Sequence, residues 1–188
     1  MKVLVISSSP NTDGLTSACA SAAVEGIRLA GGEAEEIRLN DLNVAMCQAC
    51  DNGWGTCLPE HRCQTLDDFQ ALHERVCQAD ALVLVTPVYW GEMSESAKAF
   101  TDRLRRCEAT RNDGSSRLRG KPVIAVAAAG GSGGGMITCL ASMERWIDHV
   151  RARRFDLIPV NRWSREYKLA TIRAAAQTLV VLVTTSGF

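Results

Sequence analysis

The stretch Lys2–Thr16, KVLVISSSPNTDGLT, decides how the chain can fold. Its first part, Lys2–Ile6, is a short apolar run that predicts a buried β-strand. The remainder, Ser7–Thr16, is rich in hydroxyl side chains and leads directly into an alanine-rich helical pattern. Such a turn presents backbone N–H groups, hydroxyls and the positive end of a helix dipole, which together suit a phosphate group. A helix cap without any ligand is the simpler alternative.

The rest of the chain alternates apolar runs with helical stripes. Further strands are expected at 34–39, 81–85, 122–129 and 155–160, and helices at 15–30, 66–76, 97–107, 136–150 and 169–183. Five strands alternating with five helices predict an α/β fold, a doubly wound parallel sheet with helices on both faces. The length suits the flavodoxin-like strand order 2-1-3-4-5. We expect a single domain over 1–188, with a cysteine-rich insertion at about 44–65.

The composition is that of a soluble globular protein, with 46% hydrophobic and 22% charged residues. No apolar run approaches the ~20 residues of a membrane span, and the N-terminal run is too short for the core of a signal peptide. We therefore expect a cytoplasmic protein without membrane association, whose thiols stay reduced. The net charge is zero and no long basic run is interleaved with aromatics, which argues against a nucleic-acid partner.

Two more segments follow predicted central strands and are expected at the carboxyl edge of the sheet, where folds of this class bind ligands. Thr86–Ser94, TPVYWGEMS, carries two adjacent aromatics that core packing explains poorly and that suit the face of a flat ring. Ala129–Gly135, AGGSGGG, leaves bare backbone for a ligand to approach, although a flexible loop has the same composition. Because Ser7–Thr16 has neither Gly-Lys-Ser/Thr nor GxGxxG, a single phosphate is favoured over a nucleoside triphosphate.

These residues resemble the NADPH-dependent FMN reductase family of flavodoxin-like proteins, and its iron–sulfur flavoprotein branch in particular. SSPNTDGLT, residues 8–16, is similar to the family's GSPRxxGNT, but has Asn11 where the family often has Arg and Leu15 where it has Asn. PVYWGEMS, residues 87–94, is similar to the segment beside the flavin ring, and KAFTDR, residues 98–103, to K-x-F-x-D-R on the next helix. The resemblance covers most of residues 1–135.

The resemblance implies an FMN-dependent oxidoreductase that takes hydride from NAD(P)H and passes electrons to a small-molecule or protein acceptor. The cofactor would carry out the chemistry, so no catalytic acid or base is expected from the chain. Family members form homodimers or homotetramers in which a partner chain completes the flavin pocket. The cofactor-binding residues that the resemblance implies are Ser9, Asn11, Gly14, Leu15, Thr16, Pro87, Val88, Tyr89, Trp90, Gly91, Gly130 and Gly131.

Four cysteines, Cys47, Cys50, Cys57 and Cys63, follow the second predicted strand with the spacing C-x2-C-x6-C-x5-C. The iron–sulfur branch has C-x2-C-x2-C-x4–7-C here, binding a [4Fe–4S] cluster, whereas Gly53 stands at the position of its third cysteine. Four thiolates at varied spacing can hold such a cluster. Zinc, or a metal-free loop of redox-active thiols, is the alternative. The remaining cysteines, Cys19, Cys77, Cys107 and Cys139, fall within helical stretches and are expected in the core.

Two other functions compete with the reductase. A non-enzymatic iron–sulfur flavoprotein would carry electrons between protein partners without reacting with a nicotinamide. A zinc-stabilised domain would bind another phosphorylated ligand. The turnover of NADH or NADPH and the metal content of the protein distinguish these possibilities.

Overall fold

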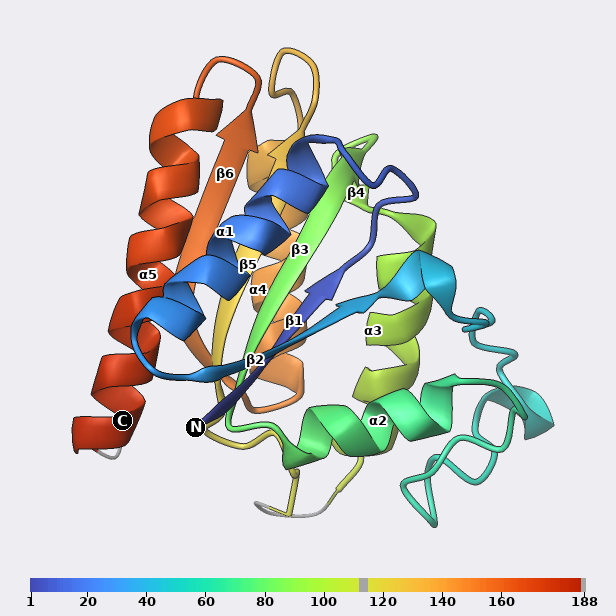
Figure 1. Ribbon diagram of the computed structural model, residues 1–188. Coiled ribbons are helices and arrows are strands. Elements are labelled where there is room, and N and C mark those ends of the chain that lie inside the picture. The colour runs from blue at the N-terminus through green and yellow to red at the C-terminus, as the bar shows by residue number, and fades with distance from the viewer. Residues whose placement is uncertain (112–114, 187–188) are drawn as a thin grey trace.

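An open sheet of parallel strands lies at the centre of the computed structural model, which describes residues 1–111 and 115–186 (Figure 1). The order across the sheet is β2-β1-β3-β5-β6, and the short β4 pairs antiparallel with β3. The strands are β1 (Lys2–Ser7), β2 (Glu33–Arg38), β3 (Ala81–Tyr89), β4 (Glu92–Met93), β5 (Pro122–Ala129) and β6 (Arg153–Asn161). Apart from β4, this is the predicted order 2-1-3-4-5, so the flavodoxin-like topology is confirmed.

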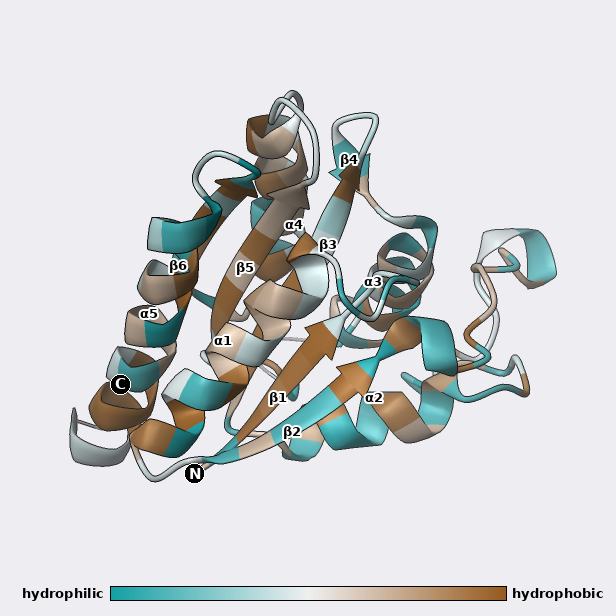
Figure 2. Ribbon diagram, turned by 45° about the horizontal axis from the view of Figure 1, so that its top comes forward, coloured by the Kyte–Doolittle hydropathy of each residue, from teal (hydrophilic) through white to brown (hydrophobic). Residues whose placement is uncertain are grey.

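Helices cover both faces of the sheet. On one face lie α1 (Leu15–Leu29) and α5 (Arg165–Ser186), and on the other α2 (Phe69–Gln78), α3 (Glu95–Glu108) and α4 (Met136–His149). Successive side chains of a strand point to opposite faces, so in β1 Val3 and Val5 pack toward α1 and α5 while Leu4 and Ile6 pack toward the other layer. Central strands are apolar along their length, whereas the edge strand β2 is largely hydrophilic (Figure 2).

Two predicted boundaries were wrong. The third strand was expected to end at Val85, but β3 continues to Tyr89, because Thr86 and Pro87 still pair with β5 and the strand then turns into β4. A helix was expected from Leu66, but α2 begins at Phe69 and Leu66 is 98% exposed. The Asp67 carboxylate accepts a hydrogen bond from the Phe69 N–H and caps the helix there.

The turn between β3 and β4 is the two-residue pair Trp90-Gly91, and both residues have positive φ, +52° and +81°. This turn rests on the N-terminus of α4. Thr138 Oγ1 donates a hydrogen bond to the Gly91 carbonyl at 3.0 Å. A Cβ atom placed on Gly135, whose φ is +80°, would lie only 2.6 Å from the Gly91 Cα, so the close approach requires glycine.

A second contact connects the loop after β1 to the start of α3. Ser94 is the N-cap of α3, and its hydroxyl donates to the Ser8 carbonyl at 2.9 Å. The Ser94 N–H donates to Thr86 Oγ1, and the Ser8 N–H donates to the Val85 carbonyl, each at 3.1 Å. The loops after β1, β3 and β5 are thereby fastened to one another at the carboxyl edge. No helix among residues 1–111 and 115–186 has the length and apolar character required to cross a membrane.

We expect Gly135→Ala to lower the free energy of unfolding by about 2–4 kcal/mol. A left-handed backbone costs an L-residue ~1–2 kcal/mol, and the added Cβ clashes with the backbone at Gly91, which costs a similar amount. Urea denaturation measures the change. Gly134→Ala is the matched control, because its nearest neighbour would be Ser132 Oγ at 3.9 Å. Equal stability of the two variants would show that the hairpin does not rest on α4 in this way.

Candidate functional site

The loop after β1 forms one end of the candidate site. Ser9 Oγ accepts a hydrogen bond from the Asn11 N–H at 3.2 Å, which tightens the turn. Gly14 is the N-cap of α1 and supplies no side-chain cap, so the positive end of the helix faces the loop. Ser9 and Thr16 are nearly buried at its base, whereas Asn11 is exposed. These features fit a phosphate held mainly by backbone N–H groups.

A cation beside this loop was not foreseen from the sequence. Arg38, the last residue of β2, donates from Nη2 to the Pro10 carbonyl at 3.4 Å. Its guanidinium also lies 3.6 Å from the Asp41 carboxylate. Arg38 therefore brings a positive charge to the loop from a neighbouring strand, where the family's arginine is replaced by Asn11. The adjacency of β1 and β2 in the sheet was the signal, since Ser7 pairs with Arg38.

The β3–β4 hairpin forms the second part of the site. Tyr89 is 38% exposed and Trp90 is fully exposed at the tip of the turn. A bulky residue with positive φ is uncommon in proteins and is often found where function requires it. Tyr89 and Trp90 line an open pocket of about 400 Å³ together with Met93 of β4 and with Met46 and Cys47 of the cysteine-rich segment. The tip of the hairpin is thus a wall of this pocket, whereas Met93 belongs to the core.

The glycine-rich loop after β5 forms the third part. Gly130 and Gly131 are exposed, and a Cβ atom on either would meet no protein atom within 4 Å. The space beside their backbone is therefore open to a ligand. Gly133 packs against Asn161 at the end of β6, a neighbour that the sequence did not reveal. The structure brings the predicted residues of all three loops to one edge of the sheet.

The cysteine-rich segment leaves η1 (Leu39–Asp41) and returns at α2, and a buried ion pair holds its two ends together. Arg103 of α3 donates to both oxygens of Asp67, at 2.5 and 2.9 Å, and to the Ala45 carbonyl at 3.0 Å. The same guanidinium lies over the Phe69 ring. Burial acts to raise the pKa of Asp67, but Arg103 and the N–H groups of Ala45 and Phe69 outweigh it and lower that pKa.

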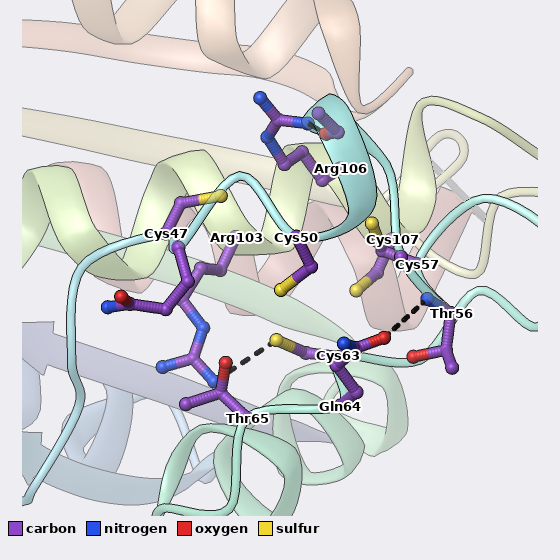
Figure 3. A pocket seen from close by; sticks show the side chains of 13 residues that line it. Cys47, Cys50, Thr56, Cys57, Cys63, Gln64, Thr65, Arg103, Arg106 and Cys107 are labelled. Atoms are coloured by element: carbon purple, nitrogen blue, oxygen red, sulfur yellow. Dashed lines mark hydrogen bonds between the residues drawn. The ribbon is translucent and has the colours of Figure 1, made fainter.

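The thiols of this segment face a small cavity of about 20 Å³. Cys47, Cys50, Cys57 and Cys63 all line it, as predicted for a common site, and the segment also contains η2 (Asp51–Gly53). Figure 3 shows a fifth cysteine there, Cys107 of α3. Burial, together with the nearby Cys63 and Cys57, raises the pKa of the Cys107 thiol to about 12.

Cys107 was expected only as a core residue, although a sequence signal existed. Arg103, Arg106 and Cys107 are spaced i, i+3 and i+4, which places them on one face of α3, and Thr110 follows just beyond the end of the helix. That face contacts the cysteine-rich segment throughout. Arg106 donates to the Gly53 carbonyl and Thr110 Oγ1 donates to the Cys57 carbonyl.

A cluster and a single zinc ion require different distances between their cysteine sulfurs. A tetrahedral zinc site with Zn–S bonds of about 2.3 Å holds its sulfurs only about 3.8 Å apart. Within the described part of the chain, the group of three metal-ligating atoms lying within 4.8 Å of one another is His73, Cys77 and Glu108, outside this cavity. A cube of four irons and four sulfides is larger than one ion and requires wider spacing. Arg103 Nη2 donates to Cys63 Sγ at 3.3 Å, a contact that would influence the reduction potential of a cluster held there.

The His73, Cys77 and Glu108 group is an ion-pair network and not a metal site. His73 Nε2 lies 2.7 Å from Glu108 Oε1, and the guanidiniums of Arg111 and Arg117 lie 3.2 and 3.5 Å from the same carboxylate. Burial acts to raise the pKa of Glu108, but His73, the Arg117 N–H and the charge of Arg111 lower it to about 2. Two guanidinium groups already neutralise this carboxylate and repel a cation.

The fold and the three joined loops define a flavodoxin-like protein with a ligand site at the carboxyl edge. The family model of NADPH-dependent FMN reductases matches residues 1–154, and the chain belongs to this family. The predicted resemblance is therefore confirmed.

Named relatives point to the iron–sulfur branch. An iron-sulfur flavoprotein of Methanocaldococcus jannaschii is 31% identical over 146 residues, 78% of this chain and 71% of that protein. An iron-sulfur flavoprotein of Archaeoglobus fulgidus is 33% identical over 135 residues, 72% of this chain and 62% of that protein. An NAD(P)H:quinone oxidoreductase structure from Methanothermobacter marburgensis has a TM-score of 0.73 at 21% identity and covers 95% of this chain and 96% of its own. The structural likeness concerns the fold.

We expect Asp67→Asn to lower the free energy of unfolding by about 3–5 kcal/mol, because it leaves the buried Arg103 charge unpaired. Urea denaturation at neutral pH measures the change. Asp102→Asn is the control, since Asp102 pairs with Lys98 on the surface of α3 and such pairs contribute about 0.3–0.5 kcal/mol. If Asp67→Asn lowered the free energy of unfolding as little as Asp102→Asn does, this would contradict the role assigned to the buried pair.

Proposed function

We propose that the chain is an FMN-dependent NAD(P)H oxidoreductase that passes electrons from a nicotinamide through FMN to a small-molecule or protein acceptor. The observation that carries this proposal is the joining of three loops at the carboxyl edge. Ser94 connects the β1 loop to α3, and Gly91 and Gly135 connect the hairpin to the glycine-rich loop. Membership of the FMN reductase family supports the same cofactor.

In this proposal the β1 loop binds the FMN phosphate. The N–H groups around Asn11, Gly14 and Leu15 and the N-terminus of α1 would hold it, with Ser9 and Thr16 as hydroxyl donors. Arg38 would offset part of the phosphate charge from the end of β2. The loop lacks a second glycine-rich turn of the kind that holds a pyrophosphate. FMN is therefore proposed in preference to FAD.

The other two loops would hold the ring. Residues Pro87, Val88, Tyr89, Trp90 and Gly91 would form its wall, and the exposed backbone at Gly130 and Gly131 would approach its polar edge. Bound FMN supplies the hydride and electron transfer. The chain itself would position the ring, exclude water from one face of it and leave the other face open to the nicotinamide and then to the acceptor.

A second copy of the chain would complete this pocket. Trp90 is fully exposed at the tip of a hairpin, and a large aromatic in that position is well suited to burial by a partner. We therefore propose a homodimer or homotetramer, acting in the cytoplasm, where the thiols of the cysteine-rich segment stay reduced.

We also propose that the cysteine-rich segment holds a [4Fe–4S] cluster. The thiols gathered around the cavity support it, as do the iron–sulfur flavoprotein relatives. Cys47 lines both this cavity and the pocket beside Trp90, so the two proposed redox groups adjoin. The same adjacency favours the second candidate function, a non-enzymatic carrier that exchanges electrons with protein partners.

The proposed phosphate site predicts that Ser9→Ala combined with Thr16→Ala weakens FMN binding by roughly 2–4 kcal/mol. Each hydroxyl would donate a hydrogen bond to a charged group, worth ~1–2 kcal/mol. Titration of the flavin-free chain with FMN, followed by flavin fluorescence, measures the affinity. Ser21→Ala combined with Thr171→Ala removes two exposed hydroxyls elsewhere and serves as the control. Equal affinity of the two double variants for FMN would mean that the phosphate binds at another place.

The reductase activity predicts that the FMN-loaded chain oxidises NADH or NADPH with a quinone as acceptor. We expect Trp90→Ala to lower this turnover by about tenfold, which is a loss of about 1.4 kcal/mol of contact with the ring. The stability of the monomeric, flavin-free chain should change by less than about 0.5 kcal/mol, because Trp90 is exposed in a single chain. Leu29→Ala, at the exposed end of α1, is the control.

A non-enzymatic electron carrier would give a different result in the same assay. The FMN-loaded chain would then oxidise neither nicotinamide, while its chemically reduced flavin would still pass electrons to a small redox protein. That result would replace the proposed enzyme with the carrier.

A further inference from the structure

Helix α3 presents a thiol to the cysteine cavity from a rigid element. Cys107 lies on the face of α3 that also carries Arg103 and Arg106, and it is fully buried. Three contacts fasten α3 and Thr110, which lies just beyond its end, to the cysteine-rich segment. Arg103 donates to Cys63 Sγ, Arg106 to the Gly53 carbonyl, and Thr110 to the Cys57 carbonyl. The helix and the segment therefore hold Cys107 in fixed relation to Cys57 and Cys63.

The cavity is lined by one more cysteine than a [4Fe–4S] cluster requires as ligands. The backbone explains why the compact spacing is absent. Gly53 stands where the compact motif has its third cysteine, and its φ is +121°, a conformation that L-residues rarely adopt. Asp51 and Asn52 before it also have positive φ. This turn cannot carry a ligating cysteine at residue 53, so the ligands come from other positions.

Cys47 and Cys107 differ in what surrounds them. Cys57 and Cys63 pack against the apolar cluster that contains Cys107. Cys47 also lines the open pocket beside Tyr89 and Trp90. Figure 3 shows the sulfurs of Cys50, Cys57, Cys63 and Cys107 gathered around one space, while the Cys47 sulfur lies to one side.

We propose that Cys107 is a ligand of the cluster together with Cys50, Cys57 and Cys63, and that Cys47 is not. This inference rests on the cluster proposed above for the cysteine-rich segment. A ligand on α3 is held in place by the packing of the helix before the cluster binds. It also places one side of the cluster against the protein interior and away from solvent. Cys47 then remains a free thiol between the cluster and the wall of the flavin pocket.

Iron and sulfide analysis of anaerobically purified protein tests the assignment, with zinc measured in the same samples. The wild-type chain should contain about four irons per chain. Cys107→Ala should lose at least half of this iron and the electron paramagnetic resonance signal of the reduced cluster. Cys47→Ala should retain both. Cys139→Ala is the matched control, because Cys139 is a fully buried cysteine of α4 in the same apolar cluster.

A second pair of measurements distinguishes the loss of a cluster ligand from damage to the fold. FMN affinity and the thermal unfolding midpoint should be the same for Cys107→Ala and Cys139→Ala when both are compared in the iron-free form. Alkylation of the iron-loaded wild-type protein, followed by peptide mass spectrometry, should modify Cys47 without release of iron. Release of iron in step with the modification of Cys47 would overturn the proposal.

Two further results would overturn the assignment of the cluster ligands. Loss of iron from Cys47→Ala, with iron retained in Cys107→Ala, would show that the four cysteines of the segment are the ligands and would overturn the inference. Protein without iron or sulfide would remove the cluster and this inference with it. The proposed reductase would still stand in that case if the same protein bound FMN and oxidised NAD(P)H, so the two failures are distinguishable.

Discussion

The buried ion pair between Arg103 and Asp67 is the constraint on which the unusual part of this structure depends. The side chains are 1% and 3% exposed, so neither charge is tolerated without the other. Asp67 also caps α2 and accepts the Ala45 N–H, and Arg103 also contacts the Ala45 carbonyl and Cys63 Sγ. One pair therefore sets the start of α2, closes the cysteine-rich segment and positions one of its thiols.

The carboxyl edge of the sheet depends on a different kind of contact. Its loops are joined by backbone approach at Gly91 and Gly135 and by single hydroxyl bonds from Ser94 and Thr138. Glycine permits the approach, and each hydroxyl donates to a backbone carbonyl of a neighbouring loop. The resulting edge is rigid where loops meet and open where Gly130 and Gly131 expose their backbone, which is the combination that a flat cofactor requires.

Helix α3 connects the two sites. Its N-cap, Ser94, is bonded to the loop of the proposed phosphate site, and its last turn carries Cys107 in the cysteine cavity. A helix of 14 residues spans about 21 Å, so one rigid element fixes the distance between a proposed flavin and a proposed cluster. Cys47 lies between them, on the border of both pockets.

The sequence by itself determined the α/β class, the strand order and the family, because buried strands read as continuous apolar runs and the loop after β1 has a distinctive composition. It also indicated which loops meet, since parallel strands end at one edge. Only the tertiary structure revealed Arg38 beside the β1 loop and Cys107 beside the cysteine segment. Both contacts join residues that are far apart in the chain. Local periodicity does not indicate which face of a helix or strand will contact a distant loop.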